Sequence, residues 1–237
     1  MNKNVCIVHY NTPYALTCLI HSINKHVSNT KIYIFENSDK HIFVNTFDNV
    51  KVFDNSKGQI LDYETILERY PERHLTPSAK YKWGSFKHCL AIQKCMELIN
   101  EPFVLMDSDV LIKKDFSNLY QEDKIFVGEI EKISKNFEPR VAPYLCFINV
   151  NKCKEYNINY YNDNILGLKL NKDNHLANDT GCYFYKNSKK YEHGIFTLNE
   201  YIIHYGRGSL YLFENNKPTL VEWINNNKDL WDNTNEQ

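Results

Sequence analysis

The sequence lacks the features of nucleic-acid-binding, disulfide-rich and membrane-spanning proteins. Its formal net charge is −1, from 28 basic and 29 acidic residues, so it has no long-range positive field to hold a nucleic-acid backbone. Its seven cysteines form no C-x-x-C pair and lie mostly inside apolar segments, where small buried thiols are more common than disulfides or zinc ligands. No apolar run is long enough to span a bilayer. We therefore expect no nucleic-acid partner and no transmembrane segment.

The amino terminus also lacks the apolar core of a signal peptide, because residues 1–4 lead directly into a strand-like segment. Together with the scattered cysteines, this predicts a reduced, cytoplasmic setting. Neither an internal repeat nor a linker-like stretch is present, and 237 residues can bury a substantial core. The sequence therefore predicts a single α/β domain over residues 1–237.

Two aspartates one residue apart, Asp107 and Asp109, follow a wholly apolar run at 103–106. Such a run, with Pro102 before it, is typical of a central strand that is covered on both faces. Ligands of open α/β sheets collect at the carboxyl ends of strands, and two ionised carboxylates this close repel each other unless a cation or several donors lie between them. The pair therefore predicts a divalent metal site. The alternative is that Asp107 caps a turn while Asp109 is solvated.

The segments before the aspartates predict alternating strands and helices. Strand-like runs at 5–10, 31–35 and 50–53 each end in polar residues, and apolar residues at helical spacing occupy 12–27 and 80–99. This succession favours a mainly parallel sheet.

The segments after the aspartates are less regular. Short apolar runs at 125–127, 145–150, 182–185 and 202–205 predict a second half of mixed strands. Near the end of the chain, residues 219–222 predict a capping box that opens a helix.

The turn at 10–13, Tyr-Asn-Thr-Pro, and the later Asp-Ser-Asp at 107–109 together resemble the GT-A glycosyltransferases, in particular the family-2-like group. The resemblance spans most of the chain. It implies a single GT-A domain with a mixed central sheet, in which residues 1–111 form a Rossmann-like half that binds the nucleotide sugar. Residues 112–237 would form the acceptor-binding half and a C-terminal helix. The implied activity is a metal-dependent, inverting transfer of a hexosyl group from a nucleoside diphosphate to a hydroxyl of a glycan or glycolipid.

For the metal, the resemblance implies Mn²⁺ or Mg²⁺, which would stabilise the negative charge on the departing diphosphate. Asp109 would be a direct ligand, Asp107 would hold ribose hydroxyls or a metal-bound water, and the two roles could be exchanged. His204, which ends a short apolar run before Gly206 and Gly208, is the expected third ligand. The alternative is a strand-end histidine whose ring is bonded to backbone.

The resemblance also implies donor contacts at the strand ends and at the start of the helix before the metal strand. Tyr10 would pack on the base, and Thr12 would bond to base or ribose unless it only caps a helix. An ordinary aromatic-anchored helix start is the alternative for the candidates at 80–85. The candidate donor-binding residues are Tyr10, Asn11, Thr12, Glu36, Asn55, Lys80, Trp83, Ser85, Asp107, Ser108, Arg207 and Ser209.

An inverting transfer needs a base that takes the proton of the acceptor hydroxyl. The resemblance implies Asp179 in this role, although Asn178 replaces one acid of the family's usual pair. Asp163 is the substitute candidate, and a turn cap is the alternative for Asp179. Retaining transfer needs no such base. Arg140 and the strand-like segment 145–149 are expected on the acceptor side.

Two other classes compete with this interpretation. Haloacid-dehalogenase-like phosphatases also have an apolar strand before Asp-x-Asp, with Asp107 as nucleophile and Asp109 as acid/base. Their motif usually stands near the amino terminus, and they need a later lysine and a pair of acids at a strand end, whereas no adjacent pair of acids follows a strand downstream here. A catalytically silent binding module with a GT-A fold is the third possibility. The nucleotide, the sugar and the acceptor stay open; a lipid-linked acceptor would bring the protein to the membrane surface as a peripheral partner.

Overall fold

A six-stranded central sheet organises the protein in the computed structural model, which describes residues 3–68, 77–132, 138–161, 179–206 and 219–232, without the side chains of 67 and 77–83. The strand order is β3-β2-β1-β4-β7-β6. Strands β1 to β4 run parallel to one another, whereas β7 is antiparallel to both β4 and β6. The predicted α/β class with a mixed, mainly parallel sheet is confirmed. The strands are β1 (Lys3–His9), β2 (Thr30–Glu36), β3 (Val50–Asp54), β4 (Phe103–Asp107), β6 (Phe126–Glu131) and β7 (Arg140–Ile148).

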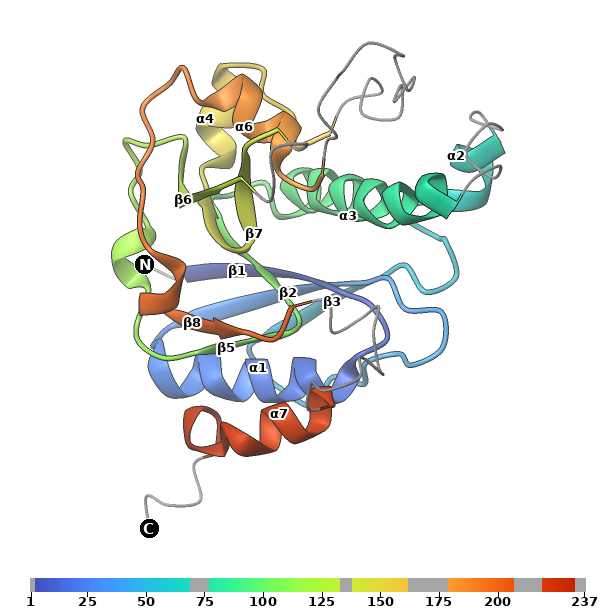
Figure 1. Cartoon of the computed structure of the whole chain (residues 1–237), viewed down its shortest axis with the longest axis vertical. Helices are drawn as coiled ribbons and strands as arrows, with labels where there is room; N and C mark the ends of the chain where they lie inside the picture. Colours follow the sequence, from blue (N-terminus) through green and yellow to red (C-terminus); the bar gives the residue numbers. More distant parts are fainter. Residues whose placement is uncertain (1–2, 69–76, 133–137, 162–178, 207–218, 233–237) are drawn as a thin grey trace.

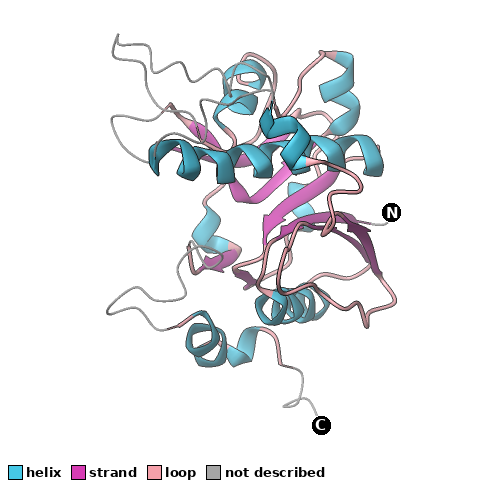
Figure 2. Ribbon diagram, turned by 90° about the vertical axis from the view of Figure 1, so that its right-hand side faces the viewer, coloured by secondary structure: helices cyan, strands magenta, loops and turns pink. Residues whose placement is uncertain are grey.

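Helices cover the sheet on both sides, as Figure 1 shows. Helix α1 (Pro13–His26) lies on one side with α7 (Leu220–Asn226) packed outside it, and α3 (Pro77–Ile99) lies on the other. Figure 2 shows the strands between these two helical layers. The remaining helices are α2 (Tyr63–Glu68), α4 (Val150–Glu155) and α6 (Cys182–Ser188), with 3-10 turns at Ser117–Leu119, Leu198–Glu200 and Lys228–Leu230. No helix of the described residues has the length and apolar character to cross a membrane.

Strand β4 is buried on both faces, as its continuous apolar sequence predicts. Val104 and Met106 pack in the core on the α1 side, while Phe103 and Leu105 pack in the core on the α3 side. This division follows from the alternation of side chains along a strand. All seven cysteines are buried free thiols, as expected for small apolar residues. The packing of these two cores against β4 fixes the strand in place, and it therefore also fixes the position of the two aspartates at its carboxyl end.

Local sequence signals set the ends of the terminal helices. Pro13 stands at the first position of α1, where its missing N–H costs no hydrogen bond. The predicted capping box is confirmed: Thr219 accepts from the Glu222 N–H at 3.2 Å, and Glu222 accepts from the Thr219 N–H at 2.7 Å.

The prediction of a strand at 182–185 is wrong, because these residues begin helix α6. Gly181 has φ 88°, and this turn allows the Cys182 N–H to donate to the Asp179 carbonyl at 3.0 Å. Phe184 then packs edge-on against Phe126, with ring centroids 5.7 Å apart. A four-residue apolar run has the same composition in a buried helix and a buried strand, so periodicity could not separate them.

A second sheet brings a late segment beside the aspartates. Strands β5 (Val110–Ile112) and β8 (Ile202–His204) pair antiparallel, with Val110 opposite His204. The Tyr205 N–H also donates to the Asp109 carbonyl at 3.0 Å. The short run at 202–205 is therefore a strand, as predicted, and its partner is the segment that follows the Asp-Ser-Asp motif.

Candidate active site

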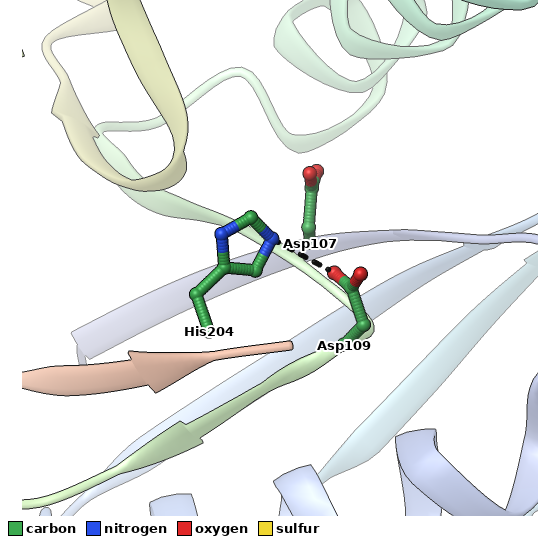
Figure 3. A group of neighbouring side chains, drawn as sticks. All are labelled: Asp107, Asp109 and His204. Atoms are coloured by element: carbon green, nitrogen blue, oxygen red, sulfur yellow. Dashed lines mark ion pairs between the residues drawn. The ribbon is translucent and has the colours of Figure 1, made fainter. Parts of the chain in front are cut away.

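The structure brings together the three residues that were predicted to bind a metal. Asp107 ends β4, Asp109 lies in the turn before β5, and His204 ends β8. One potential ligand atom from each lies within 4.8 Å of the other two. Figure 3 shows the imidazole of His204 facing Asp109, with Nε2 3.4 Å from Oδ1, and Asp107 beside them. Two separate sheets thus place two carboxylates and one imidazole around a common point.

The electrostatics of this cluster indicate a shortage of positive charge. Burial raises the pKa of Asp107, and the neighbouring Asp109 carboxylate raises it further, although His88, His204 and Arg140 oppose the shift. Burial acts to lower the pKa of His204, but the hydrogen bond and charge of Asp109, with the charge of Asp107, raise it. A cation at the centre would relieve the repulsion between the carboxylates and compete with protons for all three side chains.

The donor set fits a divalent ion. Within the described residues, Oδ1 of Asp107 is buried and accepts no hydrogen bond, so its lone pairs are available. Two carboxylates and one imidazole form an oxygen-rich set of the kind that Mn²⁺ accepts, and Mg²⁺ accepts with less preference for nitrogen. Three protein ligands would leave further coordination positions for phosphate oxygens or water.

His88 is a neighbour of the cluster that sequence analysis did not select. Its Nε2 lies 3.3 Å from Oδ1 of Asp107, without the geometry of a hydrogen bond, and in the described part of the chain neither atom has another hydrogen-bond partner. His88 comes from α3, and its contact with Asp107 places this helix near the carboxyl end of β4. No spacing rule connects a histidine on a helix with an aspartate on the next strand, so only the packing reveals this contact.

The turn after β1 lies directly against the Asp-Ser-Asp motif. Thr12 and Ser108 are both buried, and their hydroxyl oxygens are 3.0 Å apart. The Thr12 side chain makes no cap hydrogen bond to α1, so the helix-cap alternative for this residue is not supported. The Thr12 N–H donates to Nε2 of His9 at 3.0 Å. The opening turn and the motif are therefore in direct contact at the ends of β1 and β4.

Asn11 has its side chain engaged in shaping the turn. It adopts φ 55°, its Nδ2 donates to Asp39 at 2.6 Å, and its Oδ1 accepts from the Lys40 N–H at 3.1 Å. Tyr10 donates a longer hydrogen bond, of 3.4 Å, to Asp39. The half-buried Tyr10 ring keeps a surface for a ligand, whereas both ends of the Asn11 amide are already bonded.

Two of the predicted donor contacts require correction. Glu36 is fully buried, and its carboxylate accepts from Nδ1 of His9 at 2.9 Å, the Ser38 N–H at 2.8 Å and the Phe43 N–H at 2.7 Å. Asn55 is also buried, and its Oδ1 accepts from the N–H groups of Ile60 and Leu61. Both side chains are used by the protein itself to order the loops after β2 and β3. Their burial and these internal hydrogen bonds do not support direct donor contacts by the two side chains.

Asp179, the predicted base, is held by three donors. Its Oδ2 accepts from Nη1 of Arg140 at 2.8 Å, and its Oδ1 accepts from Ser85 at 2.6 Å and from the Thr180 N–H at 2.8 Å. Ser85 therefore contacts Asp179, on the side of the site away from the opening turn. Arg140 also pairs with Glu131 at 2.9 Å. Oδ2 keeps one lone pair for a further donor, so the base role of Asp179 stays a prediction.

Tyr144 connects this group with the metal candidates. Its ring centroid lies 3.8 Å from that of His204, and its hydroxyl accepts from Nη2 of Arg140. Burial raises the pKa of the Tyr144 hydroxyl, against the charge of Arg140. A path of direct contacts thus runs from the metal cluster through Tyr144 and Arg140 to Asp179. Sequence analysis assigned Arg140 to the acceptor side but did not select Tyr144.

Other sequence candidates lie where the structure gives no side-chain position. Asp163, Arg207 and Ser209 fall outside the described residues, and Lys80 and Trp83 are within α3 but without described side chains. Their roles stay predictions.

The sequence matches no protein-family model and no curated protein. Among solved structures, it is similar to the apo glycosyltransferase GlyE of Streptococcus pneumoniae TIGR4, with a TM-score of 0.49 and 10% identity over 81% of this chain and 45% of that chain. The structure of galactosyltransferase LgtC in complex with donor and acceptor sugar analogs has a TM-score of 0.48 and 10% identity, over 94% of this chain and 83% of that chain. The structure of residues 1–349 of TarS from S. aureus has a TM-score of 0.47 and 13% identity, over 89% of this chain and 62% of that chain. This chain therefore spans less than half of GlyE. At identities this low, similarity to these structures does not establish the activity of this chain.

Proposed function

We propose that this chain is a metal-dependent glycosyltransferase, which moves a hexosyl group from a nucleoside diphosphate to a hydroxyl of a glycan or glycolipid. The observation that carries the proposal is the meeting of Asp107, Asp109 and His204, with ligand atoms within 4.8 Å of one another. This cluster lies at the carboxyl end of β4, which is parallel to β1. Ligands of such sheets bind at this edge.

A bound Mn²⁺ or Mg²⁺ would neutralise the charge that develops on the diphosphate as it leaves. Asp109 and His204 face each other and would be direct ligands. Asp107 would add an oxygen from the end of β4, and His88 would hold that carboxylate in position from α3. The imidazole makes Mn²⁺ the preferred ion of the two.

The nucleoside would lie on the turn after β1, where Tyr10 offers a half-buried ring and Thr12 meets Ser108. The acceptor would approach from the side of Arg140 and Asp179. In an inverting reaction, the free lone pair of Asp179 Oδ2 would take the proton of the acceptor hydroxyl. Arg140 already occupies one lone pair of this oxygen through its ion pair, and a retaining reaction without this base is the competing mechanism.

The finer assignments rest on the sequence resemblance. They are family-2-like membership, a nucleotide-binding half at 1–111, an acceptor-binding half at 112–237, and action at the cytoplasmic side on surface-polysaccharide or lipo-oligosaccharide precursors. A lipid-linked acceptor would give peripheral membrane association.

The direct test is calorimetric titration with UDP, GDP, CDP and ADP, in Mn²⁺ and in EDTA. We expect one nucleotide to bind in Mn²⁺, and we expect Asp109→Asn and His204→Ala each to weaken Mn²⁺ binding by more than about 100-fold, since even residues that only support a ligand matter by 10–100-fold. His41→Ala is the matched control, because the exposed His41 contributes only its backbone N–H to Asn11. Failure of all four nucleotides to bind in Mn²⁺ would refute the proposal.

A phosphate-release assay separates the phosphatase alternative. A haloacid-dehalogenase-like enzyme would hydrolyse a generic phosphate ester without a sugar nucleotide and would lose this activity in Asp107→Asn. We expect no such hydrolysis.

A further inference from the structure

Lys87 of α3 is enclosed by two tyrosine rings at the donor side of the site. Its Nζ lies 5.4 Å from the ring centroid of Tyr10 and 5.4 Å from that of Tyr63. Each distance is within the range in which a ring face attracts a cation. The ammonium group therefore sits between aromatic surfaces from two different parts of the chain.

Lys87 is half-buried, and no carboxylate among the described residues forms an ion pair with it. Burial lowers the pKa of Lys87, and the charge of Asp39 opposes this only in part. Ring faces attract a cation, but they carry no charge that would compensate it. Binding of an anion would therefore strongly stabilise this partly desolvated ammonium group.

A network of hydrogen bonds fixes the enclosure. The Tyr63 hydroxyl donates to the Lys87 carbonyl at 3.3 Å and accepts from Asn37 at 2.9 Å. Asn37 in turn accepts from Nδ2 of Asn55 at 3.0 Å. Asn55, which does not itself face a ligand, thereby positions Tyr63 through Asn37. Residues of α3, of the loop after β2 and of the loop after β3 together hold the Tyr63 ring beside Lys87.

The place of Lys87 relates it to the metal cluster. Tyr10 follows β1 and Asn37 follows β2, and these strand ends are neighbours because His9 is paired with Glu36. The next residue of α3, His88, reaches Asp107 at the end of β4. Lys87 thus lies over the ends of β1 and β2, one to two strand spacings, or roughly 5–10 Å, along the sheet from β4. A nucleotide that lies along this edge with its phosphates at the metal cluster would extend toward Lys87.

We infer that Lys87 binds a phosphate oxygen of the donor nucleotide, as a cation that acts independently of the metal, and this inference rests on the proposed function. An ammonium group offers three donors and no acceptor, so its ligand must present oxygen atoms. Charge-assisted contacts to phosphate are the strongest it can make. A carbonyl oxygen of the base would satisfy its hydrogen bonds but would leave its charge uncompensated.

The test compares the nucleoside diphosphate that binds in Mn²⁺ with its parent nucleoside, by calorimetry in Mn²⁺. We expect Lys87→Met to lower the affinity for the nucleoside diphosphate by about 10-fold or more, since a hydrogen bond to a charged group contributes 1.5–3 kcal/mol. Its affinity for Mn²⁺ alone should be that of the wild type. Affinity for the nucleoside should stay the same. Lys87→Arg, which keeps the charge, should retain most of the affinity for the diphosphate.

Lys94→Met is the matched control, because Lys94 lies on the same helix and pairs with Glu97 at the surface. It should bind like the wild type, and thermal unfolding should show that all variants are folded. Equal diphosphate binding by Lys87→Met and wild type would overturn the inference while the proposed function stands. If Lys87→Met lowers the affinity for the nucleoside as much as the affinity for the diphosphate, the inference is wrong and Lys87 contacts the base instead. If the wild type binds no diphosphate in Mn²⁺, the proposed function fails, and the inference fails with it.

Discussion

Arg140 and Asp179 form a buried ion pair, with Nη1 and Oδ2 2.8 Å apart. Arg140 begins β7 and Asp179 precedes α6, so the pair joins the antiparallel strand of the sheet to the helix beside it. The same guanidinium contacts Glu131 and Tyr144, and Tyr144 lies on His204. One arginine therefore connects the acceptor side of the candidate site with its metal ligands, and stability and activity should both depend on it.

Arg140→Met should lower the free energy of unfolding by up to about 3–5 kcal/mol, because it leaves two partly buried carboxylates without their counter-charge. Urea unfolding at pH 7 measures this loss. Lys114→Met is the control: the Lys114–Glu200 pair is exposed at both ends, and such pairs contribute about 0–1 kcal/mol. Similar losses in the two variants would contradict a structural role for the Arg140 ion pairs.

Asp179→Asn separates a base from a positioning residue. If Asp179 is the base, the rate of transfer should fall by about 100-fold or more and nucleotide affinity should be unchanged. Ser85→Ala, which removes a hydrogen bond to Oδ1 and leaves the carboxylate, is the matched variant and should keep most of the rate. A transfer rate of Asp179→Asn close to that of Ser85→Ala would assign Asp179 to positioning Arg140.

Glu36→Gln should destabilise the protein in a pH-dependent way. Burial acts to raise the pKa of Glu36, but its hydrogen bonds and charge interaction with His9, and its bonds from Ser38 and Phe43, lower it overall. A lowered folded-state pKa means that the ionised carboxylate stabilises the protein above the usual glutamate pKa of about 4.3, and that this contribution is lost as the pH falls through the folded-state value.

Chemical unfolding of wild type and Glu36→Gln between pH 7 and pH 3 checks this dependence. The difference should be about 1.5–3 kcal/mol at pH 7, the range for hydrogen bonds to a charged group, and should shrink below pH 4.3. A difference that stays constant over the whole range would show that the charge of Glu36 contributes nothing.

Gly181→Ala should be strongly destabilising. Gly181 has φ 88°, and an added Cβ would lie 2.2 Å from the carbonyl oxygen of Val141, so the backbone of β7 or the turn before α6 would have to move. The strained backbone alone costs about 1–2 kcal/mol for a residue with a side chain, and the clash adds to it.

Gly84→Ala is the matched control for this substitution. Gly84 lies in α3, and a Cβ added there would have no neighbouring atom within 4 Å, so alanine should stabilise the helix by up to about 1 kcal/mol. Thermal unfolding of the two variants should shift in opposite directions. A Gly181→Ala protein as stable as the wild type would show that the turn before α6 can adopt another conformation.

His88→Ala should weaken Mn²⁺ binding by about 10–100-fold, the range for residues that orient a metal ligand, which is less than the loss expected for Asp109→Asn. Its Nε2 is 3.3 Å from Oδ1 of Asp107, so its removal frees that carboxylate to rotate. Mn²⁺ titration in the absence of nucleotide gives the affinity. His21→Ala is the control, since His21 packs on Phe47 away from the cluster. Unchanged affinity in His88→Ala would show that Asp107 is held by the strand alone.

Neighbouring residues in the chain were enough to predict the mainly parallel sheet, the aspartates at the end of a strand buried on both faces, and the capping box at Thr219. Each of these features has a local cause, in continuous hydrophobicity, in turn residues or in the spacing of a cap. The meeting of Asp107, Asp109 and His204 was also predicted, the two aspartates from the D-x-D motif and the histidine from the family resemblance of its segment.

The tertiary structure, in contrast, selects which polar side chains face the site and which ones the protein uses for itself. Glu36 and Asn55 follow strands just as Asp107 does, yet loops fold over them and occupy their oxygens. Other residues, among them His88, Tyr144 and Lys87, reach the site because α3 and β7 pack against the strand ends. Such contacts join residues far apart in the chain, and their geometry depends on the packing of whole elements. Local sequence has no periodicity or spacing that predicts these contacts. The run at 182–185 is likewise too short for its pattern to separate a helix from a strand, and tertiary packing decides between them.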